Sequence, residues 1–586
     1  MENLNLEWSS LIVEELVRNN ITHFCISPGS RSTPLTIAAA KHPRTKTVLI
    51  LDERSAGYYA VGYAKAVRRP TVLICTSGTA VANYFPAIIE AFHSNLPLII
   101  ITADRPSELR KCGANQTIDQ TKIFSDYLRW EIDLPSPNTA ISKETLLHWI
   151  NQAVSHAVGI SPGPVHINCM FRKPLIPMEA DEFKINLSVS EQWNKSDAPL
   201  KMYEQSNITP SENTINKLSQ LLSKEKGLLI IGELNSEEEC RSVEKFAEKL
   251  NWPTVTDILS GLRLTKKYDN FVDHYEQIIC SERSNCQTKY ETVFHIGGTI
   301  LSEKLQIYIK SIKPVKYIKA SSNSSENDPN HLVTLKIHSD LNILCSKLIH
   351  RISDKNRSNS IQVTMLEKQQ KKIEEKLDIF SETDSLISEI SVARLTTTHI
   401  KENSALFIGN SMPIRDFNSY SKRSDNTDRK HLVKIGANRG VSGIDGIIAS
   451  ACGFFSGFKK KGTLVLGDLS LLHDMNSLSI IDSTKIKIII IAINNNGGGI
   501  FSFLPISKHK DIFDKYFGTP HNYSFKQLSE MFGLEYFNPV KNKDFIEIYN
   551  ECQQKQESCL IEIKTSREKN IQEHKILNDE ITKIIN

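Results

Sequence analysis

The chain has 586 residues, of which 40% are hydrophobic and 24% are charged, which is typical of a globular protein. This length is too great for a single hydrophobic core, so we expect about three or four domains. The 71 basic and 67 acidic residues nearly balance at a net charge of +4, and no dense Lys/Arg stripe with interleaved aromatic residues occurs. The sequence therefore gives no sign of a nucleic-acid-binding surface.

The sequence also lacks the usual marks of export or membrane insertion. Residues 1–7 are acidic and polar, unlike a signal or transit peptide, and the longest apolar run, at 486–493, is too short to span a membrane. The 11 cysteines are scattered without a C-x-x-C pair. We therefore expect reduced thiols and a cytoplasmic protein, with Cys25 and Cys75 as core residues because they lie inside apolar runs.

Short apolar runs alternate with helical stretches along most of the chain, a pattern that predicts buried parallel strands. A linker rich in Glu, Ser, Asn and Lys at 181–213 and a charged, partly helical linker at 351–379 divide this pattern into three blocks. We therefore predict three doubly wound α/β domains with mainly parallel sheets, at 1–180, 214–350 and 380–586. The outer two blocks look like two copies of one architecture, although no convincing sequence repeat relates them. The predicted strands lie near 23–27, 47–51, 71–75, 97–102 and 164–168; near 228–231, 293–296, 315–318 and 333–337; and near 405–408, 432–435, 463–466, 485–493 and 560–563.

Two segments of the third block carry oxygen ligands of the kind that Mg²⁺ prefers. Asp468 follows the apolar run at 463–466 after Gly467, and Asn495 follows the next run along the chain after Asn494. Residues 471–481 between them have the spacing of a helix, so the two strands should run parallel and both loops should open at one carboxyl edge. There, a carboxylate and an amide oxygen beside glycines suit a cation that holds a phosphate ester. The alternative is that Asp468 is a helix N-cap and that residues 494–499 form an ordinary turn.

The first block places further polar groups after its strands. Glu53 follows the run at 47–51 and precedes a helix at 58–66, so it is either a functional carboxyl group or a first-turn acid that complements the helix dipole. Arg31 and Arg105 lie in loops after the first and fourth predicted strands, and guanidinium groups bind carboxylates in a bidentate manner. Residues 113–116 (GANQ) add amide groups. Each of these loops could also be an ordinary turn with a surface arginine.

Together these segments resemble thiamine-diphosphate enzymes and, among them, the family of 2-succinyl-5-enolpyruvyl-6-hydroxy-3-cyclohexene-1-carboxylate synthases of menaquinone biosynthesis. The threonine-serine-glycine turn at 76–80 matches the pyrimidine-binding domain of the wider superfamily, and residues 467–495 match its metal–diphosphate motif. The wider superfamily has glycine where this chain has Leu469, and the synthase family has leucine there. The segments that carry the resemblance, in chain order, are SPGSRSTPL at 27–35, DERSAG at 52–57, ITADRP at 101–106, CGANQ at 112–116, NRGVSGIDG at 438–446, GDLS at 467–470 and NNNGGGIF at 494–501.

The resemblance implies a transferase that decarboxylates 2-oxoglutarate and adds the succinyl carbanion equivalent to isochorismate. It implies thiamine diphosphate as cofactor, with Mg²⁺, or alternatively Mn²⁺, held by Asp468, Asn495 and the carbonyl of Gly497. Glu53 would bind N1′ of the aminopyrimidine ring, and Ile444 would lie beneath the bent cofactor, where an ordinary core isoleucine is the alternative. The cofactor-binding residues implied are Glu53, Gly78, Ser411, Ile444, Gly467, Asp468, Leu469, Asn495 and Gly497.

The same resemblance implies which residues contact the carboxylate-rich substrates. Arg415 and Arg439 join Glu53 as catalytic residues, and Phe501 and Leu504 could equally be packing residues. Lys304 is the implied contact from the central domain, although the neighbouring Glu303 departs from the basic character of that segment in the family. The implied substrate residues are Ser30, Arg31, Arg105, Asn115, Gln116, Lys304, Ser411, Arg415, Arg439, Ile500, Phe501 and Leu504.

The resemblance further implies a homodimer or homotetramer, with the pyrimidine domain of one subunit facing the diphosphate domain of another. The nearest rival is another thiamine-diphosphate lyase, such as an acetolactate synthase or a 2-oxoacid decarboxylase. A binding protein that keeps the fold without the chemistry is a rival of a different class. A nicotinamide dehydrogenase is disfavoured because no G-x-G-x-x-G follows a predicted strand.

Overall fold

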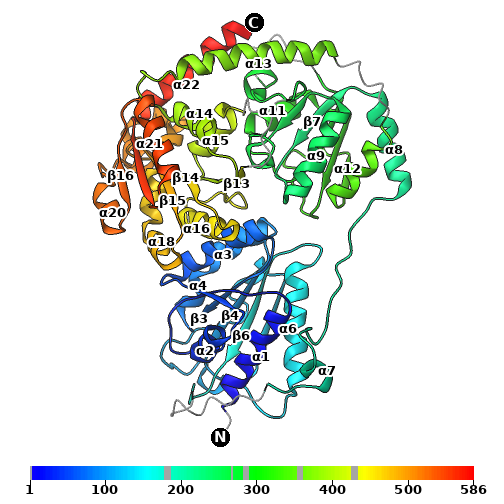
Figure 1. Ribbon diagram of the computed structural model, residues 1–586, viewed down its shortest axis with the longest axis vertical. Coiled ribbons are helices and arrows are strands. Elements are labelled where there is room, and N and C mark those ends of the chain that lie inside the picture. The colour runs from blue at the N-terminus through cyan, green and yellow to red at the C-terminus, as the bar shows by residue number, and fades with distance from the viewer. Residues whose placement is uncertain are drawn as a thin grey trace. The chain divides into compact units, whose positions relative to one another are not determined.

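Three parallel β-sheets organise the chain in the computed structural model, which describes residues 3–176, 187–265, 268–280, 289–352, 360–423 and 433–585 (Figure 1). The expected domain boundary at 180/181, Cys286, residues 353–359 and Leu432 lie outside the described residues. The chain divides into two compact units. The first comprises Met1–Gln205, Asn438–Lys460 and Leu472–Lys487, and the second comprises Ser206–Ala437, Lys461–Leu471 and Ile488–Asn586.

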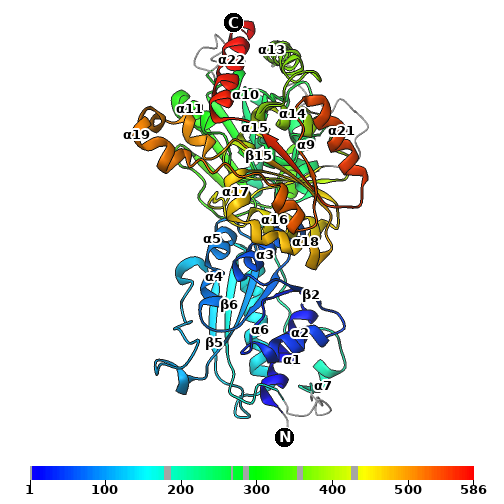
Figure 2. The ribbon, with the colours of Figure 1, turned by 90° about the vertical axis from the view of Figure 1, so that its left-hand side faces the viewer.

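The first unit contains a six-stranded sheet in the order β2-β1-β3-β4-β6-β5, with every neighbouring pair parallel. In Figure 2, β2 and β5 lie at opposite margins of this sheet. Its strands are β1 (His23–Ile26), β2 (Lys46–Leu49), β3 (Thr71–Cys75), β4 (Leu98–Asp104), β5 (Trp130–Leu134) and β6 (Pro164–Met170). The helices of this unit are α1 (Leu4–Arg18), α2 (Thr33–Lys41), α3 (Glu53–Val67), α4 (Thr79–Asn83), α5 (Phe85–His93), α6 (Lys143–Val158), α7 (Glu191–Asn194), α16 (Ile447–Phe458) and α18 (Ser479–Thr484), with 3₁₀ turns η1 (Ser107–Leu109), η2 (Ser125–Tyr127) and η6 (Met475–Leu478).

The second unit contains two sheets, a five-stranded one in the order β11-β10-β9-β7-β8 and a six-stranded one in the order β13-β12-β14-β15-β17-β16. Helices α9 and α12 pack on the five-stranded sheet, where Phe246 and Leu344 join its core (Figure 1). The strands are β7 (Gly227–Ile231), β8 (Thr254–Thr256), β9 (Thr292–Ile296), β10 (Lys316–Ser321) and β11 (Leu335–His338), then β12 (Ala405–Ile408), β13 (Lys434–Gly436), β14 (Gly462–Gly467), β15 (Ile488–Asn494), β16 (Glu535–Phe537) and β17 (Cys559–Lys564). The helices are α8 (Glu212–Lys224), α9 (Glu237–Leu250), α10 (Tyr275–Ile278), α11 (Glu303–Ile312), α12 (Leu341–Ile349), α13 (Ser360–Phe380), α14 (Glu389–His399), α15 (Met412–Tyr420), α19 (Lys510–Phe513), α20 (Lys526–Met531), α21 (Asn542–Gln554) and α22 (Arg567–Ile585), with shorter turns η4 (Ile258–Ser260), η7 (Gly499–Phe503), η8 (Pro505–Lys508) and η9 (Asp514–Gly518).

The two six-stranded sheets have the same strand order, 2-1-3-4-6-5 when each is numbered from its own first strand. This confirms the prediction that the first and third blocks share one architecture, and the three parallel sheets confirm the α/β fold class. Central strands such as β3, β4 and β15 are buried along their whole length. Their near-continuous Val/Ile/Leu runs are therefore what strands covered on both faces require.

The strand predictions were wrong in two respects. β2 was expected to be a buried strand, but it is an edge strand and most of it is exposed. Strands β5, β8 and β16 were not predicted, and each lies at the edge of its sheet. Edge strands pair on one side only and are often short, so they lack the continuous apolar run on which the prediction relied.

The single helix predicted at 471–481 was also wrong. Three short segments take its place, α17 (Asp468–His473), η6 and α18. The break falls at Asp474, whose φ of −120° and ψ of 18° are not helical. This carboxylate is fully buried and binds backbone N–H groups of α16, so a tertiary contact overrides the local helical pattern.

Helices α3 and α16 form a tightly packed pair in the first unit (Figures 1 and 2). A Cβ atom on Gly62 would lie 1.8 Å from the carbonyl oxygen of Ser450, and one on Gly453 would lie 1.9 Å from that of Tyr59. Glycine is therefore required at both positions for the backbones to approach. Because Gly62 contacts Ser450 while Gly457 contacts Ala66 further along, the two helices run parallel and begin at the same end.

No helix in the described part of the chain combines the length and apolar character that crossing a bilayer requires. The described cysteines are all free thiols, and Cys25 and Cys75 are fully buried in strands as predicted.

Candidate active site

The third sheet reverses its strand order between β12 and β14, which is where open α/β sheets usually bind ligands. The loop after β12 carries Ser411, which has a φ of 72° at the N-cap of α15. A non-glycine residue held in this region is strained, and such strain clusters at functional sites. The loop after β14 carries Asp468. The predicted cofactor residues of this block therefore flank a topological switch point.

Asp468 is 2% exposed and touches the next loop along the sheet. Its Oδ1 accepts a hydrogen bond from the backbone N–H of Leu469 at 2.7 Å, and its Oδ2 accepts one from that of Gly497 at 2.9 Å. Nε2 of His521 lies 3.2 Å from Oδ2. Burial raises the pKa of Asp468 above its ordinary value. The predicted meeting of the 467–470 and 494–499 loops is confirmed, because β14 and β15 pair in parallel up to Gly467 and Ile493.

Asn495 presents an amide oxygen without a partner beside this carboxylate. Its Nδ2 donates to Oε1 of Glu389 at 2.9 Å, while its Oδ1 is buried and accepts no hydrogen bond in the described part of the chain. A buried acceptor without a donor costs about 1–3 kcal/mol. A cation at Oδ1 would remove that cost.

Gly497 and Gly498, in the loop that follows Asn495, have room only for backbone. Gly497 has a φ of 129°, and a Cβ atom there would lie 1.8 Å from the carbonyl oxygen of Gly518. By contrast, nothing lies within 4 Å of a Cβ atom built on Gly467, so open space adjoins the 467–470 loop. These features fit a diphosphate group that approaches glycine backbone.

The oxygen set of Asp468, Asn495 and the Gly497 carbonyl fits Mg²⁺, which takes one or two protein oxygens together with substrate phosphates. No group of three or more His, Cys, Asp or Glu side chains that could hold a metal occurs among the described residues. A cation at this edge would therefore depend on a phosphate ligand as well as on the protein.

Glu389, which was not predicted from the sequence, binds the side-chain amide of Asn495. It begins α14, is 1% exposed, and its Oε1 also accepts a hydrogen bond from Oγ1 of Thr565 at 3.1 Å. Burial, and next the nearby negative charge of Asp416, raise its pKa to about 7. It stands far from Asn495 in the sequence and outside the quoted motifs, so no local pattern marked it.

In the first unit, the loops that carry Arg31, Thr76 and Arg105 meet at the carboxyl edge of the sheet, as predicted, and the 113–116 segment joins them. The backbone N–H of Arg31 donates to Oγ1 of Thr76 at 3.3 Å, and Nη1 of Arg105 donates to Oγ of Ser77 at 2.7 Å. Nη2 of Arg105 donates to the carbonyl of Asn115 at 2.8 Å. The switch in strand order between β1 and β3 lies at the same edge.

Arg31 and Arg105 bring two positive charges together. Arg31 is 6% exposed and donates through Nη1 to the carbonyl of Phe171 at 2.7 Å. Burial, and next the positive charge of Arg105, lower the pKa of Arg31. Two guanidinium groups that repel each other in a partly buried place suit an anionic ligand between them.

Gln116 covers the turn at 76–80. Its Nε2 donates to the carbonyl of Ser77 at 3.0 Å, and Gly78 donates its N–H to Oε1 of Gln120 at 3.0 Å. Gly78 has a φ of 90°, and the side chain of Gln116 approaches to 3.0 Å from its Cβ position. Gln120 was not predicted, because a buried amide that satisfies backbone gives no sequence signal.

Glu53 is the first residue of α3, after the N-cap Asp52, whose Oδ1 accepts from the N–H of Arg54 at 2.8 Å. Its carboxyl group is half-buried and forms no hydrogen bond with another side chain among the described residues. Burial raises its pKa, and its charge acts on Cys75 at the end of β3 and on Tyr84 between α4 and α5. The first-turn position fits the dipole interpretation, but the absence of a side-chain partner among the described residues leaves the carboxyl group available for a ligand.

Ile444 and Arg439 lie in the loop that leads into α16. Ile444 is 38% exposed, so it is not an ordinary core isoleucine in this structure. The loop is held by Glu90, whose two carboxylate oxygens accept from the N–H groups of Gly440 and Val441, each at 2.8 Å. Arg439 is half-buried in the same segment.

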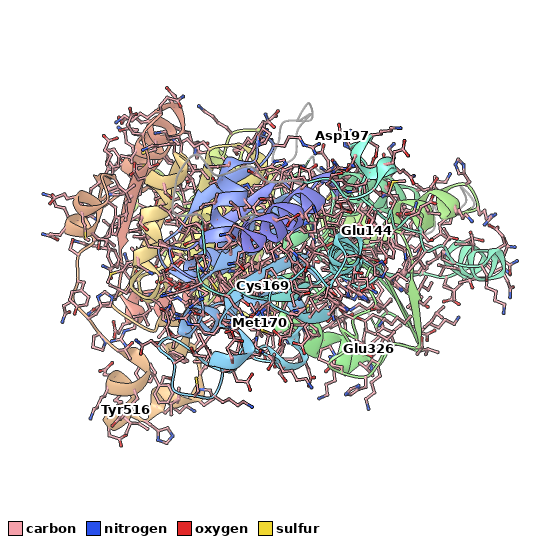
Figure 3. All side chains as sticks on the ribbon, turned by 90° about the horizontal axis from the view of Figure 1, so that it is seen from below. Glu144, Cys169, Met170, Asp197, Glu326 and Tyr516 are labelled. Carbon is pink, nitrogen blue, oxygen red and sulfur yellow. The ribbon has the colours of Figure 1, made fainter. Side chains whose placement is uncertain are left out.

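The remaining predicted residues lie on the surface or in loops. Arg415 is exposed and donates to the carbonyl of Ser411 at 2.6 Å, and Nζ of Lys304 lies 3.7 Å from Oε2 of Glu276. Ser30 and Asn115 are exposed, while Leu469 and Ile500 are half-buried. Phe501 and Leu504 are 36% and 47% exposed, in a segment that ends in further exposed apolar side chains such as Tyr516 (Figure 3).

Comparison with known proteins places these features in one family. The model of the N-terminal TPP-binding domain of thiamine pyrophosphate enzymes matches residues 6–123, and the model of the middle domain of thiamine pyrophosphate enzymes matches residues 186–408. The chain is 40% identical over 576 residues to the 2-succinyl-5-enolpyruvyl-6-hydroxy-3-cyclohexene-1-carboxylate synthase of Prosthecochloris aestuarii. The aligned residues make up 98% of this chain and 97% of that relative. It is 40% identical over 579 residues to the synthase of the same name from Chlorobium phaeobacteroides, with 99% and 98% covered, and 39% identical over 584 residues to that of Pelodictyon phaeoclathratiforme, with 100% and 97% covered.

Identity of this extent over nearly the whole length of both chains, together with the thiamine-diphosphate domains, agrees with the motifs found in the sequence. The parallel α/β sheets and the loops at their carboxyl edges agree with it too. The chain therefore belongs to the 2-succinyl-5-enolpyruvyl-6-hydroxy-3-cyclohexene-1-carboxylate synthase family of thiamine-diphosphate enzymes.

Proposed function

We propose that this protein decarboxylates 2-oxoglutarate and adds the succinyl carbanion equivalent to isochorismate, releasing CO₂ and 2-succinyl-5-enolpyruvyl-6-hydroxy-3-cyclohexene-1-carboxylate for menaquinone biosynthesis. The observation that carries the proposal is the buried Oδ1 of Asn495, which has no hydrogen-bond partner among the described residues, in a loop whose Gly497 N–H binds the buried carboxylate of Asp468. Both lie on one parallel crossover at a glycine-rich edge. A cation together with a phosphate ester would satisfy the acceptor of Asn495 and the charge of Asp468.

The cofactor proposed is thiamine diphosphate with Mg²⁺, for which Mn²⁺ is an alternative. When bound, thiamine diphosphate supplies the electron sink for decarboxylation and carbon–carbon bond formation. Asp468, Asn495 and the carbonyl of Gly497 would hold the metal, while Gly467, Leu469 and Ser411 would contact the cofactor. Gly78 would allow close approach of backbone at the pyrimidine end.

Glu53 is proposed to hold the proton at N1′ of the aminopyrimidine ring. Its raised pKa suits a carboxyl group that exchanges a proton nearer to neutral pH than an exposed glutamate does. Ile444, with its exposed side chain, would support the cofactor from below. Replacing the carboxyl group by an amide should lower product formation by about 10²–10⁴-fold.

The substrates carry several carboxylates, which the arginines would bind. Arg31 and Arg105 are suited to one carboxylate because their two positive charges repel each other and an anion would neutralise that repulsion. Arg415 and Arg439 would act on the reacting substrates. The other proposed contacts are Ser30, Asn115, Gln116, Lys304, Ser411, Ile500, Phe501 and Leu504.

The proposed assembly is a homodimer or homotetramer in the cytoplasm. In it, the unit that carries Glu53 in one subunit would complete the site that carries Asp468 in another. A sedimentation measurement in which a fully active monomer appears would overturn this part of the proposal.

The test is incubation with thiamine diphosphate, Mg²⁺, 2-oxoglutarate and isochorismate, followed by mass analysis of the product. Expected is a product formed from both substrates, with CO₂ released from 2-oxoglutarate and little from pyruvate. Preference for pyruvate would instead identify an acetolactate synthase or decarboxylase. A wild-type rate in Glu53→Gln, with Glu131→Gln on the exposed face of β5 as the matched control, would exclude the proposed catalytic role.

A further inference from the structure

Asp474 supplies a helix cap that the local sequence of α16 lacks. The residue at the N-cap position is Gly446, which has no side chain to accept from the first N–H groups of the helix. Oδ2 of Asp474 accepts them instead, from Ile448 at 2.8 Å and from Ala449 at 3.1 Å. Asp474 is fully buried. It therefore satisfies donors that a helix N-terminus otherwise leaves open.

A glycine at the N-cap follows from the packing of α3 against α16. Gly446 has a φ of 62°, and a Cβ atom there would lie 1.9 Å from Cγ of the Tyr58 ring. The hydroxyl group of Tyr58 donates to Oδ2 of Asp445 at 2.6 Å. Tyr58 thus occupies the space in which a capping side chain would stand, and the cap has to come from elsewhere in the chain.

The same segment also binds the first turn of α3. Oγ of Ser477 donates to Oδ1 of Asp474 at 2.7 Å and lies 2.8 Å from Oγ of Ser55. The side-chain amide of Asn476 donates to the carboxylate of Asp52, the N-cap of α3. The segment 474–477 is therefore joined to residues on both sides of Glu53.

Arg54 completes this junction. Its Nη2 donates to the carbonyl of His473 at 3.1 Å and lies 4.0 Å from Oδ1 of Asp474. Asp474 thereby faces one cation and three hydrogen-bond donors while fully shielded from water. A buried carboxylate with this many partners is held in a single position.

We propose that Asp474 is a positioning residue that fixes the start of α3, and with it Glu53, against the first turn of α16. Because α3 and α16 run parallel and begin at the same end, joining their first turns holds Glu53 in one position. The inference rests on the proposed role of Glu53. It adds that a segment beginning six residues after Asp468 sets the position of that residue.

The experiment measures hydrogen–deuterium exchange at C2 of bound thiamine diphosphate without substrate, because the proton that Glu53 would hold at N1′ would favour transfer of the C2 proton to the amino nitrogen of the same ring. The variants are Asp474→Ala, Asp474→Asn and the double variant Asn476→Ala/Ser477→Ala, each in the full chain with Mg²⁺. Asp482→Ala is the matched control, because Asp482 lies on α18 with its side chain 88% exposed. The cofactor dissociation constant and the melting temperature are measured for each protein.

We expect Asp474→Ala to slow exchange by about 10–100-fold, because small displacements of a catalytic group have effects of this size. Asp474→Asn keeps an acceptor for the two N–H groups and should recover most of that rate. The double variant leaves the cap on α16 intact and breaks the junction to α3. It should slow exchange at least about fivefold, while the melting temperature and the cofactor affinity stay near those of the control.

Wild-type exchange in a folded Asp474→Ala would overturn the inference. If Asp474→Ala does not fold, wild-type exchange in the double variant would overturn it equally, because a cap that only stabilises α16 does not require that junction. Glu53→Gln is run in parallel. Wild-type exchange in Glu53→Gln would refute the proposed role of Glu53 itself, so failure of the function and failure of the positioning role are distinguishable.

Discussion

The side-chain amide of Asn495 donates to Oε1 of Glu389 over 2.9 Å, which turns the Oδ1 of Asn495 away from Glu389 and leaves it buried with no donor among the described residues. An asparagine that could rotate freely would present either end of its amide to a ligand. Here a fully buried carboxylate selects the oxygen. The orientation of a proposed metal ligand is therefore set by a residue of another helix, in the manner of residues that surround metal sites generally.

The first prediction concerns Glu389→Leu, which removes the acceptor for the Asn495 amide. We expect the affinity for Mn²⁺ in the presence of thiamine diphosphate to fall by about 10–100-fold, as for other residues that orient metal ligands. Titration calorimetry or the electron paramagnetic resonance signal of free Mn²⁺ measures it. Glu389→Gln retains a carbonyl acceptor and should show a smaller loss, and Glu382→Leu, at an exposed position, should show none. Unchanged affinity in a folded Glu389→Leu would contradict the prediction.

Asp468→Asn should abolish the rise in melting temperature that Mg²⁺ with thiamine diphosphate causes. A ligand present at about 100 times its dissociation constant stabilises a protein by about 2.7 kcal/mol, so Mg²⁺ with thiamine diphosphate should raise the wild-type melting temperature. Asparagine retains one oxygen that can accept from Leu469 or Gly497 but lacks the charge that a cation requires. We expect a melting temperature close to wild type without ligands and little rise with them. Asp482→Asn is the control, and a wild-type rise in Asp468→Asn would exclude Asp468 as a metal ligand.

Gly446→Ala should destabilise the first unit by about 2–4 kcal/mol, because it combines a strained φ of 62° with a clash against the Tyr58 ring. Gly113→Ala separates the two causes. Gly113 has a φ of 76° but nothing within 4 Å of its Cβ position, so this variant reports backbone strain alone. Thermal unfolding of both variants measures the difference. Equal effects would show that Tyr58 moves aside without cost.

His23→Phe should change how stability depends on pH. His23 stacks on Tyr63 with ring centroids 3.7 Å apart, and burial, with a smaller effect of Lys46, lowers its pKa from 6.5 to about 4. Between these pH values the unfolded chain binds a proton that the folded protein does not. Wild-type stability should therefore fall by up to about 3 kcal/mol as the pH drops through this window, and should be fully present above it.

Phenylalanine keeps the stacking and removes the titration, so the variant should gain melting temperature relative to wild type at pH 5 but not at pH 7.5. His156→Phe is the control, since His156 stacks on Trp130 but is exposed. A gain at pH 5 that is no larger than the gain at pH 7.5 would refute the assigned pKa.

The contrast between central and edge strands shows where sequence reasoning works for this fold. β14 and β15 were predicted because both faces of each are covered, which requires a continuous apolar run. β5 reads Trp-Glu-Ile-Asp-Leu with alternating exposure, and β16 has three residues. Both depend on a neighbouring strand for their conformation. Their own residues carry little of the information that makes them strands.

At the site, too, the residues of the sequence motifs could be predicted, whereas the residues that act through long-range contacts could not. Asp468 and Asn495 were expected to approach each other because strand–helix–strand connectivity forces consecutive parallel strands to end at one edge. Glu389 and Asp474 were not expected to matter. They act on partners distant in the chain, and a buried carboxylate in a helical stretch looks the same in the sequence as a surface one.

The sequence by itself determined the α/β class, the matching outer blocks and the loops that carry Glu53, Arg31, Arg105, Asp468 and Asn495. These features follow from continuous apolar runs and from the order of strands and helices, which can be read in short segments of the chain. Only the tertiary structure decided the edge strands, the breaking of the 471–481 helix at Asp474 and the orientation of the Asn495 amide. The edge strands arise from backbone pairing with a neighbouring strand, and the other two features arise when a side chain satisfies a donor or acceptor on a distant element. The free energy of such a contact depends on shared burial, which no single segment specifies.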